Sequence, residues 1–509
     1  MSLRMSAILS FLVLSAAVIS SAAEPPSRDG VRSALSKASV FFQQEVASGG
    51  GYVYAYSGDL ALREGEGKAE NNVIWIQPPG TPAVGEALLD AYAATGDQLH
   101  LQGARAAAEA LVRGQLQSGG WYYHVVVESE GRKAFRYRAD NPGALERSEK
   151  PNERGGPGWD RWKLRKGKGD ITTLDDDTTQ AATRFLVRID KALEFKDRPI
   201  HEAAVYALSS LLNAQYANGG WSANYDRYPV DRPSEQDYPV LKASYQEKWS
   251  WEWPKDFTGC YVTNDNLVPD MIDTMLMAAE VYGDNKYLAC AERAGDFLIL
   301  AQMPEPQPAW AQQYDAKMQP SWSRAFEPPA VSGGESQQII EALMTLYRAT
   351  GNKKYLEPIP SALAWLNKSA LPDGRLARFY ELKTNKPLYF VIQEDGREVM
   401  TYSSDKLPTH YGFIVSSRAA KLERDYQTVL SGSFPEKRDG NSVAKRPGKV
   451  SEGTAAQVRK VVGLLDGRGA WVEQGKLRTY KKHPEGDIIR SQTFIDNVRL
   501  LSRYLEATR

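Results

Sequence analysis

The 509-residue chain has few of the side chains that form disulfide frameworks or zinc sites. It contains two cysteines, Cys260 and Cys290, and five histidines. There is no HExxH motif and no histidine-rich cluster, so a zinc enzyme is not expected. Net charge is also lacking, because 63 Lys and Arg balance 63 Asp and Glu. A neutral chain has no general attraction for a polyphosphate backbone, so we expect no nucleic-acid partner.

Long apolar runs are confined to the N-terminus, MSLRMSAILSFLVLSAAVISSAAEPP. A positive Arg4, an apolar stretch and the small residues before Glu24 form the pattern of a cleavable signal peptide. We therefore expect residues 1–23 to be removed and the protein to be secreted or periplasmic, with no membrane contact after cleavage. An uncleaved anchor is the alternative. No later apolar run reaches the length of a membrane span.

The rest of the chain contains repeated pairs of helical segments. Each pair consists of a helix, a Gly/Asn/Asp break, a second helix and a Gly- or Pro-rich turn, and three of the turns end in tryptophan. The four pairs end at Trp121, Trp221, Trp310 and Ala377. Stacked helix pairs are expected, because one pair cannot bury its own apolar face. Periodicity alone does not distinguish an open solenoid from an α/α toroid.

Apolar spacing supports the helical assignment of these repeats. Ala182, Phe185, Leu186, Ile189 and Leu193 recur at intervals of three and four, which places them on one face of a helix. We predict a single all-α domain over residues 24–509, an incomplete barrel of helix pairs with long irregular loops. Polar, Gly- and Pro-containing insertions are expected near residues 141–169, 225–259 and 431–451.

Acidic residues recur at the starts of equivalent repeat helices. Asp175–Asp177 stand in a row in ITTLDDDTTQ, Asp265 occupies the corresponding place in the next repeat, and Glu335 and Glu86 begin two others. An aspartate that caps a helix explains any one of them. It does not explain three adjacent like charges, which repel one another. Carboxylates of neighbouring repeats that converge on one hard cation would offset this cost, and oxygen ligands suit Ca²⁺.

Two further segments combine aromatic rings with basic side chains. QPAWAQQYDAKMQPSWSRAFEPPAVSGGES contains Trp310 and Arg324, and DGRLARFYELKTNKPLYF contains Arg378, Tyr380 and Lys386. Rings can pack on sugar faces, and guanidinium groups bind carboxylates with two parallel hydrogen bonds. An anionic sugar is therefore a candidate ligand. The structural alternative is a surface arginine packed over a tyrosine.

These segments together resemble polysaccharide lyase family ten, the pectate lyases with an α/α toroid fold. TLDDDTT stands in place of the family's TIDN-(G/D)-AT, and TNDNLV in place of FNDDAM. The family's PxWxxQxD…ARAYE…SGSES is similar to the Trp310 segment, and its ARFYEL-x-TNRP to ARFYELKTNKP. The four motifs occur in family order between about Thr173 and Phe390.

The resemblance implies roles for individual residues. Calcium ligands would fall on Asp175 and Asp265, and the catalytic base on Arg378. Arg324 and Lys386 would lie near substrate carboxylates, with Trp310 and Tyr380 in the same substrate-binding segments. Because a guanidinium is rarely a base, Lys386 and Tyr380 are alternative bases.

The function that the resemblance implies is calcium-dependent cleavage of polygalacturonate by β-elimination, performed by a monomer. Two alternatives remain open. One is an inverting glycoside hydrolase that uses Asp175 and Asp265 as acid and base. The other is a non-catalytic polysaccharide-binding protein that uses Trp121, Trp221 and Trp310 as stacking platforms. An Mg²⁺–diphosphate site of a terpenoid enzyme fits poorly, because DDDTT lacks the two-residue gap between aspartates.

The aspartate run gives a more specific expectation. Asp175 occupies the first acidic position of the family-like motif, so we predict that it is the cation ligand. Asp176 is then expected to cap the helix or support the ligand, and Asp177 to be largely solvated, with little effect of its substitution on turnover.

Overall fold

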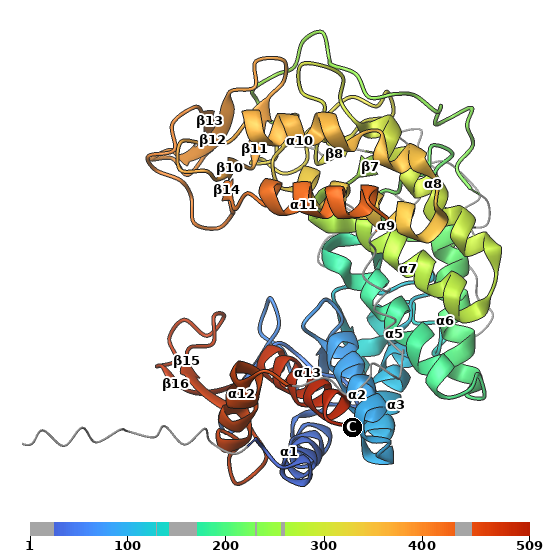
Figure 1. The fold of residues 1–509 in the computed structure, drawn as a ribbon, viewed down its shortest axis with the longest axis vertical. Coiled ribbons are helices and arrows are strands. Elements are labelled where there is room, and N and C mark those ends of the chain that lie inside the picture. Colours follow the sequence, from blue (N-terminus) through green and yellow to red (C-terminus); the bar gives the residue numbers. More distant parts are fainter. Residues whose placement is uncertain (1–24, 129, 142–169, 230–231, 256–259, 433–449) are drawn as a thin grey trace, which may run out of the picture.

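A computed structural model describes residues 25–128, 130–141, 170–229, 232–255, 260–432 and 450–509. Its helices form two rows around an arc, which Figure 1 shows as an open C shape. The inner row consists of α13 (Ser491–Ala507), α2 (Thr81–Thr95), α5 (Thr178–Ala192), α7 (Leu267–Tyr282), α9 (Glu335–Thr350) and α11 (Ala419–Leu430). The outer row consists of α12 (Glu452–Gly463), α1 (Arg28–Phe41), α3 (Gln98–Gly114), α6 (Arg198–Ala214), α8 (Asn285–Ala301) and α10 (Ile359–Lys368).

Each inner helix packs on its inner neighbours and on its own outer partner. The pairs α2–α3, α5–α6, α7–α8 and α9–α10 are the four repeats expected from the sequence. The rows do not meet between α11 and α12, where Figure 1 shows the opening of the arc. The predicted all-α architecture, an incomplete α/α toroid, is thus confirmed.

The apolar face of α5 illustrates why these segments fold as helices. Ala182, Phe185, Leu186 and Ile189 are fully buried, as their spacing predicts. Leu193 lies just beyond the last helical residue and is partly buried. The opposite face carries Arg184 and Arg188, whose side chains reach carboxylates on neighbouring segments. Burial of this face, rather than helix propensity, fixes α5 between its neighbours.

Short antiparallel sheets join the ends of the helices, and they were not expected from the sequence. One sheet has the order β15 (Val472–Gly475), β16 (Gly486–Arg490), β1 (Ala55–Ser57), β2 (Arg63–Glu64), and so ties the two ends of the described chain together. Ala55 lies opposite Arg490 on one side and Glu64 on the other. A second sheet has the order β13 (Glu398–Thr401), β12 (Pro387–Ile392), β11 (Phe379–Glu381), β9 (Ala330–Ser332). It contains the segment that follows the last predicted helix pair, which ends at Ala377.

Four two-stranded ladders complete the described strands. They are β3 (Val73–Trp75) with β4 (His124–Val126), β5 (Thr172–Thr173) with β6 (Asn224–Tyr225), β7 (Tyr261–Val262) with β8 (Gln313–Tyr314), and β10 (Leu376–Ala377) with β14 (Ile414–Val415). Three of them lie where an outer helix returns to the next inner helix. They fix the rim on which the inner helices α2, α5 and α7 begin.

Several sequence-based expectations concern residues outside the described part of the chain. These are the signal peptide at residues 1–23 and most of the insertions at 141–169 and 431–451. The insertion at 225–259 is largely described and is irregular after β6, as expected. Cys260 and Cys290 are not joined by a disulfide, and the buried thiol of Cys290 donates to the Gln215 side chain at 3.3 Å. Among the described helices, none has the length and apolar character needed to cross a membrane.

Candidate functional site

Three buried tryptophans hold the rim of the inner helices from behind. Trp121, Trp221 and Trp310 are each 0% exposed, and each indole N–H donates to a carbonyl of the preceding outer helix at 2.7–2.9 Å. Their own carbonyls accept from the backbone N–H groups of Thr173, Val262 and Ser332 at 2.9, 2.9 and 2.7 Å. These three acceptor bonds fix the strands β5, β7 and β9, which lead directly into the acidic residues of the site.

The stacking role considered for these tryptophans is therefore wrong. A ring that is closed off from solvent on both faces cannot pack against a sugar, so Trp310 is not available for stacking. Its function is to position the strand that precedes α9. The repeated tryptophan turns identified in the sequence thus correspond to a repeated structural element behind the site.

Two equivalent turns place the acidic residues at the starts of α5 and α7. The turn η3 (Asp175–Asp177) and the turn η4 (Asn264–Asn266) have the same backbone conformation. Asp176 has a φ of 50° and Asp265 a φ of 47°, both left-handed. Aspartate and asparagine tolerate this region better than most residues. The structural counterpart of Asp265 is therefore Asp176, the middle residue of the aspartate run.

The two turns bring three carboxylates together. One oxygen each of Asp175, Asp176 and Asp265 lies within 4.8 Å of the other two, and we call this group the carboxylate triplet. Asp175 accepts a hydrogen bond from the Tyr123 hydroxyl at 2.6 Å, and Asp176 accepts one from Gln77 Nε2 at 2.9 Å. The triplet thus combines the two predicted ligands with a third carboxylate.

Mutual repulsion and burial both disfavour ionisation of the triplet. Burial, and then the charge of Asp175, raise the pKa of Asp176 to about 7. The same two influences, together with the charge of Asp176, raise the pKa of Asp265 to about 8. Burial also raises the pKa of Asp175, although the Tyr123 hydroxyl and Arg324 oppose this shift. Three carboxylates with raised pKa values bind either protons or a cation.

The donor set of the triplet fits a hard divalent cation. Its ligand atoms are carboxylate oxygens, which Ca²⁺ prefers, and three protein ligands leave further positions for substrate or water. Neither cysteine nor histidine contributes to the triplet, so softer metals have no matching ligands here. Asp175, Asp176 and Asp265 are the residues that would hold the ion.

The expectations for the other two aspartates of the run are corrected. Asp176 does not cap α5, because its carboxylate contacts Gln77 and the triplet. Asp177 is not solvated: its carboxylate forms an ion pair with Arg184, and its side chain is 24% exposed. The N-cap residue of α5 is Asp177, but its side chain makes no capping hydrogen bond. The ion pair replaces the cap.

Substitution of Asp177 by asparagine is expected to lower stability more than turnover. Arg184 also donates to the Asp270 carbonyl at 3.2 Å and to Thr274 at 3.1 Å. Without Asp177, this guanidinium loses its charged partner, at a cost of about 1–3 kcal/mol. Chemical denaturation should show a lower midpoint, with activity retained. An unchanged midpoint in Asp177→Asn would contradict the structural role of this pair.

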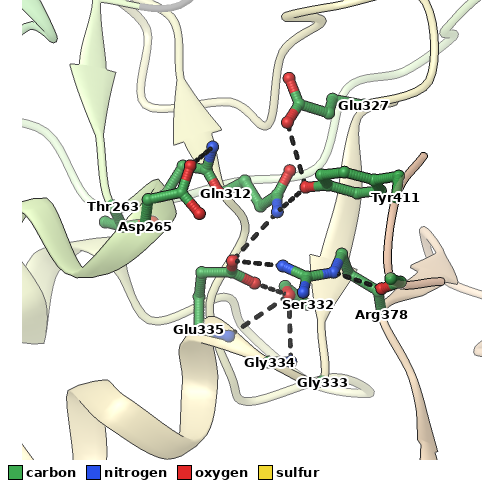
Figure 2. A network of polar contacts seen from close by, with 12 residues as sticks. Thr263, Asp265, Gln312, Glu327, Ser332, Gly333, Gly334, Glu335, Arg378 and Tyr411 are labelled. Carbon is green, nitrogen blue, oxygen red and sulfur yellow. Dashed lines mark hydrogen bonds and ion pairs between the residues drawn. The ribbon is translucent and has the colours of Figure 1, made fainter. Parts of the chain in front are cut away.

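Arg378 and Glu335 form the opposite wall of the site (Figure 2). Arg378 lies between β10 and β11, and its Nη1 donates to Glu335 Oε1 at 3.1 Å while its Nε donates to the Gly412 carbonyl at 2.7 Å. Burial lowers the pKa of Arg378, but the charges of Glu335, Tyr411 and Asp265 outweigh it and raise that pKa. The guanidinium is thus held in a fixed orientation and remains protonated.

A glycine permits the close approach between these two walls. Gly333 precedes α9, and its backbone N–H donates to the Arg378 carbonyl at 3.0 Å. A Cβ atom at Gly333 would lie 2.3 Å from the Ala377 carbonyl oxygen. Any larger residue would therefore push β10 away from α9 and separate Arg378 from Glu335.

Tyr411 connects Arg378 with the second predicted arginine. Its hydroxyl donates to Glu327 at 3.0 Å and accepts from Gln312 Nε2 at 3.1 Å (Figure 2). The guanidinium carbons of Arg378 and Arg324 lie 4.8 and 5.5 Å from its ring centroid. Arg324 also pairs with Glu327 and acts on the triplet, where its charge lowers the pKa of Asp265. The structure thus brings Arg324 and Arg378 to one site.

A cavity of about 680 Å³ opens between the two walls. Acidic side chains outnumber basic ones in its lining. Its charged residues are Asp176, Asp177, Asp265, Asp270, Glu335, Glu341, Arg378 and Arg418. An anionic ligand would be repelled from such a cavity unless a cation compensated the carboxylates.

Of the predicted site residues, Asp265 and Arg378 line this cavity, and Tyr380 and Lys386 are among those that do not. Tyr380 is 1% exposed, and its hydroxyl donates to the Ser369 carbonyl and accepts from the Ala377 N–H. Lys386 is exposed beside the Tyr402 ring instead of facing the triplet. Tyr380 is therefore a structural residue, and neither side chain lines the cavity. Glu86, expected at a helix start, lies within α2 and pairs with Arg188.

Sequence reasoning missed several residues of the site. Asp176 could have been found by aligning the triplets DDD and NDN by their middle residue. Tyr123, Gln77, Gln312 and Tyr411 carried no comparable signal, because they come from segments that only the fold brings to the rim. Glu335 was identified as a rim carboxylate, but its pairing with Arg378 was not foreseen.

Comparison with known proteins gives a family match over part of the chain. Residues 304–449 match the family described as pectic acid lyase. No curated protein matches the chain. This matched region contains Arg324, Glu335, Arg378 and Tyr411.

Solved structures similar to this one have low sequence identity. A mutant of the family 10 polysaccharide lyase from Cellvibrio cellulosa, in complex with trigalacturonic acid, is 18% identical with a TM-score of 0.43; the match covers 69% of this chain and 98% of that one. A cellobiose 2-epimerase from Bacillus thermoamylovorans is 13% identical, with coverages of 94% and 98% and a TM-score of 0.44. A GH76 α-mannanase from Bacteroides thetaiotaomicron is 10% identical, with coverages of 94% and 96% and a TM-score of 0.42.

Two of the four sequence motifs that resemble those of the pectic acid lyases fall inside the matched region. One contains Arg324 and the other contains Arg378. The resemblance of this chain to the pectic acid lyase family is thereby confirmed, and residues 304–449 carry it.

Proposed function

We propose that this protein is an exported, calcium-dependent pectate lyase that cleaves polygalacturonate by β-elimination. The observation that carries the proposal is a single cavity lined by Arg378 and by Asp176 and Asp265 of the carboxylate triplet. The family match over residues 304–449 supports the reaction class. The signal-peptide pattern of the first 23 residues supports export.

Elimination requires that the proton at C5 of the uronate become acidic. A Ca²⁺ bound by Asp175, Asp176 and Asp265 would neutralise the uronate carboxylate and stabilise the charge that develops when C5 is deprotonated. The acidic lining of the cavity is otherwise unfavourable to an anionic sugar. The side chains of the triplet therefore have the role of holding the ion at the point where the carboxylate enters.

Arg378 is the residue that would face the C5 proton. Of the three candidate bases taken from the sequence, it is the one that lines the cavity. Because Glu335 and Asp265 raise its pKa, the ion-free enzyme keeps it protonated. A cation that compensates the charge of Asp265 would remove one of the influences that raise the pKa of Arg378. Arg378 can act as a base only after it loses its proton, so we expect activity to increase toward alkaline pH. The glycosidic oxygen would be protonated by water as it leaves.

The two alternatives have less support. An inverting hydrolase needs carboxyl groups roughly 6.5–9.5 Å apart to admit a water molecule, whereas the oxygens of the triplet lie within 4.8 Å of one another. The binding-protein alternative relied on Trp121, Trp221 and Trp310, which are fully buried.

The direct test is an assay on polygalacturonate with Ca²⁺ or with EDTA. With Ca²⁺, the ultraviolet absorbance of the unsaturated uronate product should rise, and EDTA should abolish the rise. A hydrolase would give saturated sugars without this absorbance and would not respond to EDTA. Release of reducing ends without unsaturated product would refute the proposal.

The stability of the ion-free protein is expected to fall as pH rises from about 4 to about 8. Asp176 and Asp265 have folded-state pKa values of about 7 and about 8, above the ordinary value near 4 of an unfolded chain. In this interval the folded state binds more protons than the unfolded state, so each increment of pH lowers the free energy of unfolding. Binding of Ca²⁺ removes the repulsion that causes the decline.

Thermal unfolding in EDTA and in Ca²⁺ measures this effect. We expect Ca²⁺ to raise the melting temperature by a few degrees at about pH 8 and by much less at about pH 5, where protons compete for the same oxygens. Mg²⁺, which demands stricter geometry, serves as the control ion. Equal stabilisation by Ca²⁺ at both pH values would show that the ion binds elsewhere.

A further inference from the structure

Two exposed aromatic rings meet where the 225–259 insertion reaches the sheet formed by β9, β11, β12 and β13. Trp251 of the insertion is 40% exposed, and Tyr402, the residue after β13, is 45% exposed. Their ring centroids lie 5.3 Å apart with planes at 77°. Trp249 stacks against Trp251 at 6.2 Å and 20°. Neither exposed ring belongs to the lining of the catalytic cavity.

Two lysines of the turn between β11 and β12 accompany these rings. Lys386 Nζ lies 5.1 Å from the centroid of the Tyr402 ring, and Lys383 Nζ lies 5.9 Å from that of Tyr245, another residue of the insertion. Within the described part of the chain, neither ammonium group forms a salt bridge with a carboxylate. Glu381, the acidic side chain of this turn, instead accepts hydrogen bonds from the hydroxyls of Tyr402 and Thr384. Both ammonium groups are therefore available to pair with the carboxylate of a ligand.

The insertion is fixed to the segment that contains Arg324. The indole N–H of Trp322 donates to the Ser250 carbonyl at 3.1 Å, and that of Trp253 donates to the Ser323 carbonyl at 2.7 Å. These two bonds hold Trp251 in place between them. They also connect the exposed rings through Ser323 with Arg324, whose charge acts on the carboxylate triplet.

We propose that Trp251, Tyr402 and Lys386 form a second binding site, the aromatic platform, for a uronate unit of an acidic polysaccharide outside the catalytic cavity. The apolar face of a pyranose ring packs on the indole, as rigid aromatic anchors do at other interfaces. The sugar carboxylate pairs with the Lys386 ammonium. A neutral sugar would leave this charge unused. The identity of the sugar rests on the proposed function, whereas the surface itself does not.

The platform predicts weaker binding of long chains when it is removed. Trp251→Ala and Lys386→Met are compared with the wild type by affinity electrophoresis in gels that contain polygalacturonate and EDTA. EDTA prevents turnover and removes the cation from the catalytic cavity, so the retardation that remains reports on other sites. We expect each variant to bind about tenfold more weakly, and Lys386→Arg to retain the wild-type retardation. Phe195→Ala removes another exposed aromatic ring, 45% exposed, and should migrate as the wild type does.

Three outcomes would overturn the platform. The first is unchanged retardation of both Trp251→Ala and Lys386→Met. The second is retardation that is equal in a neutral galactan gel and insensitive to Lys386→Met, because the ligand would then not be a uronate. The third is a wild-type dimer that Trp251→Ala dissociates in sedimentation, since a second copy of the chain would then occupy the surface.

A second measurement separates this proposal from the lyase assignment. With Ca²⁺, Trp251→Ala should cleave a trigalacturonate at the wild-type rate but show an elevated KM on the polymer, because a short substrate held in the catalytic cavity does not depend on the platform. Equal loss on both substrates would mean that the substitution disturbs the catalytic cavity and would overturn the platform. If the wild type forms no unsaturated product at all, the lyase proposal fails, while the retardation of the variants in EDTA still decides the platform.

Discussion

Replacement of Arg378 by alanine is expected to lower the rate of elimination on polygalacturonate by about three orders of magnitude. The alanine variant removes the group that would face the C5 proton. It also leaves Glu335 without the guanidinium group that it contacts at 3.1 Å. Arg378→Lys should also lose most activity, because an ammonium cannot satisfy both Glu335 and the Gly412 carbonyl in the same geometry. The initial rate of product absorbance, measured across pH, tests both variants.

The matched control for this prediction is Arg418→Ala. Arg418 lines the same cavity but pairs with Glu341 at 2.7 Å, away from the carboxylate triplet. Its removal should change kcat less than about tenfold. The residual activity of Arg378→Lys should show its pH dependence displaced to lower pH if Arg378 is the base, because a lysine ammonium loses its proton more readily. Rates near the wild type in both Arg378 variants would refute the assignment of the base.

The helical frame could be predicted from the sequence because its signal is local. The spacing of Phe185, Leu186 and Ile189 fixes one apolar face of α5, and the same pattern recurs in the other pairs. The opening of the arc between α11 and α12 has no such signal, since it depends on how many pairs stack and on how the termini close. The short sheets were missed for a related reason: a strand of two or three residues, such as β5 or β7, carries no measurable alternation.

The tryptophan turns show where a correct pattern led to an incorrect role. The recurrence of Trp121, Trp221 and Trp310 was visible in the sequence, and the repeat architecture that it implied is present. A tryptophan in a Gly-rich turn has the same sequence appearance whether it faces a sugar or the core. Only the tertiary structure reveals that each indole donates to the preceding helix. Burial, not residue type, determines the role.

The acidic site was partly predictable. Convergence of Asp175 and Asp265 followed from the recurrence of acidic residues at equivalent helix starts, and the structure places both in one cluster. The inclusion of Asp176 depends on its left-handed backbone, which turns its carboxylate back toward Asp175 and could not be derived from an aspartate run. Asp177, just before α5, pairs with Arg184, which lies about two turns further along the chain. This ion pair neutralises a charge that was expected from the sequence to face solvent.

Arg378 illustrates a further limit of sequence reasoning. Its position in ARFYELKTNKP identified it, but its surroundings come from distant segments. Glu335 lies at the start of α9, and Tyr411 lies in the segment before β14; the three meet because β11 pairs with β9 and β10 pairs with β14. The direction of its pKa shift therefore depends on the fold. This shift opposes a base at neutral pH, which makes a bound cation and an alkaline optimum parts of the same proposal.

Replacement of Asp265 by asparagine is expected to abolish calcium-dependent activity, with a loss of about 10²–10³-fold in kcat. Asp265 is the contribution of η4 to the triplet, so its loss leaves only ligands from η3. The asparagine keeps the size of the side chain and removes one negative charge. It thereby relieves both the cost of burying that charge and its repulsion by Asp175. The melting temperature in EDTA at about pH 8 should therefore rise or stay unchanged.

The control for this variant is Asp270→Asn. Asp270 lines the same cavity, and burial together with the charge of Asp177 raises its pKa to about 8, yet it is not part of the triplet. Both variants remove one carboxylate from one cavity, so a general electrostatic effect would appear in both. Isothermal titration with Ca²⁺ separates the two cases independently of turnover: the affinity should collapse in Asp265→Asn and persist in Asp270→Asn. If Asp265→Asn binds Ca²⁺ as the wild type does and its melting temperature falls, then the carboxylate stabilises the η4 turn, and the cation must be held by other residues.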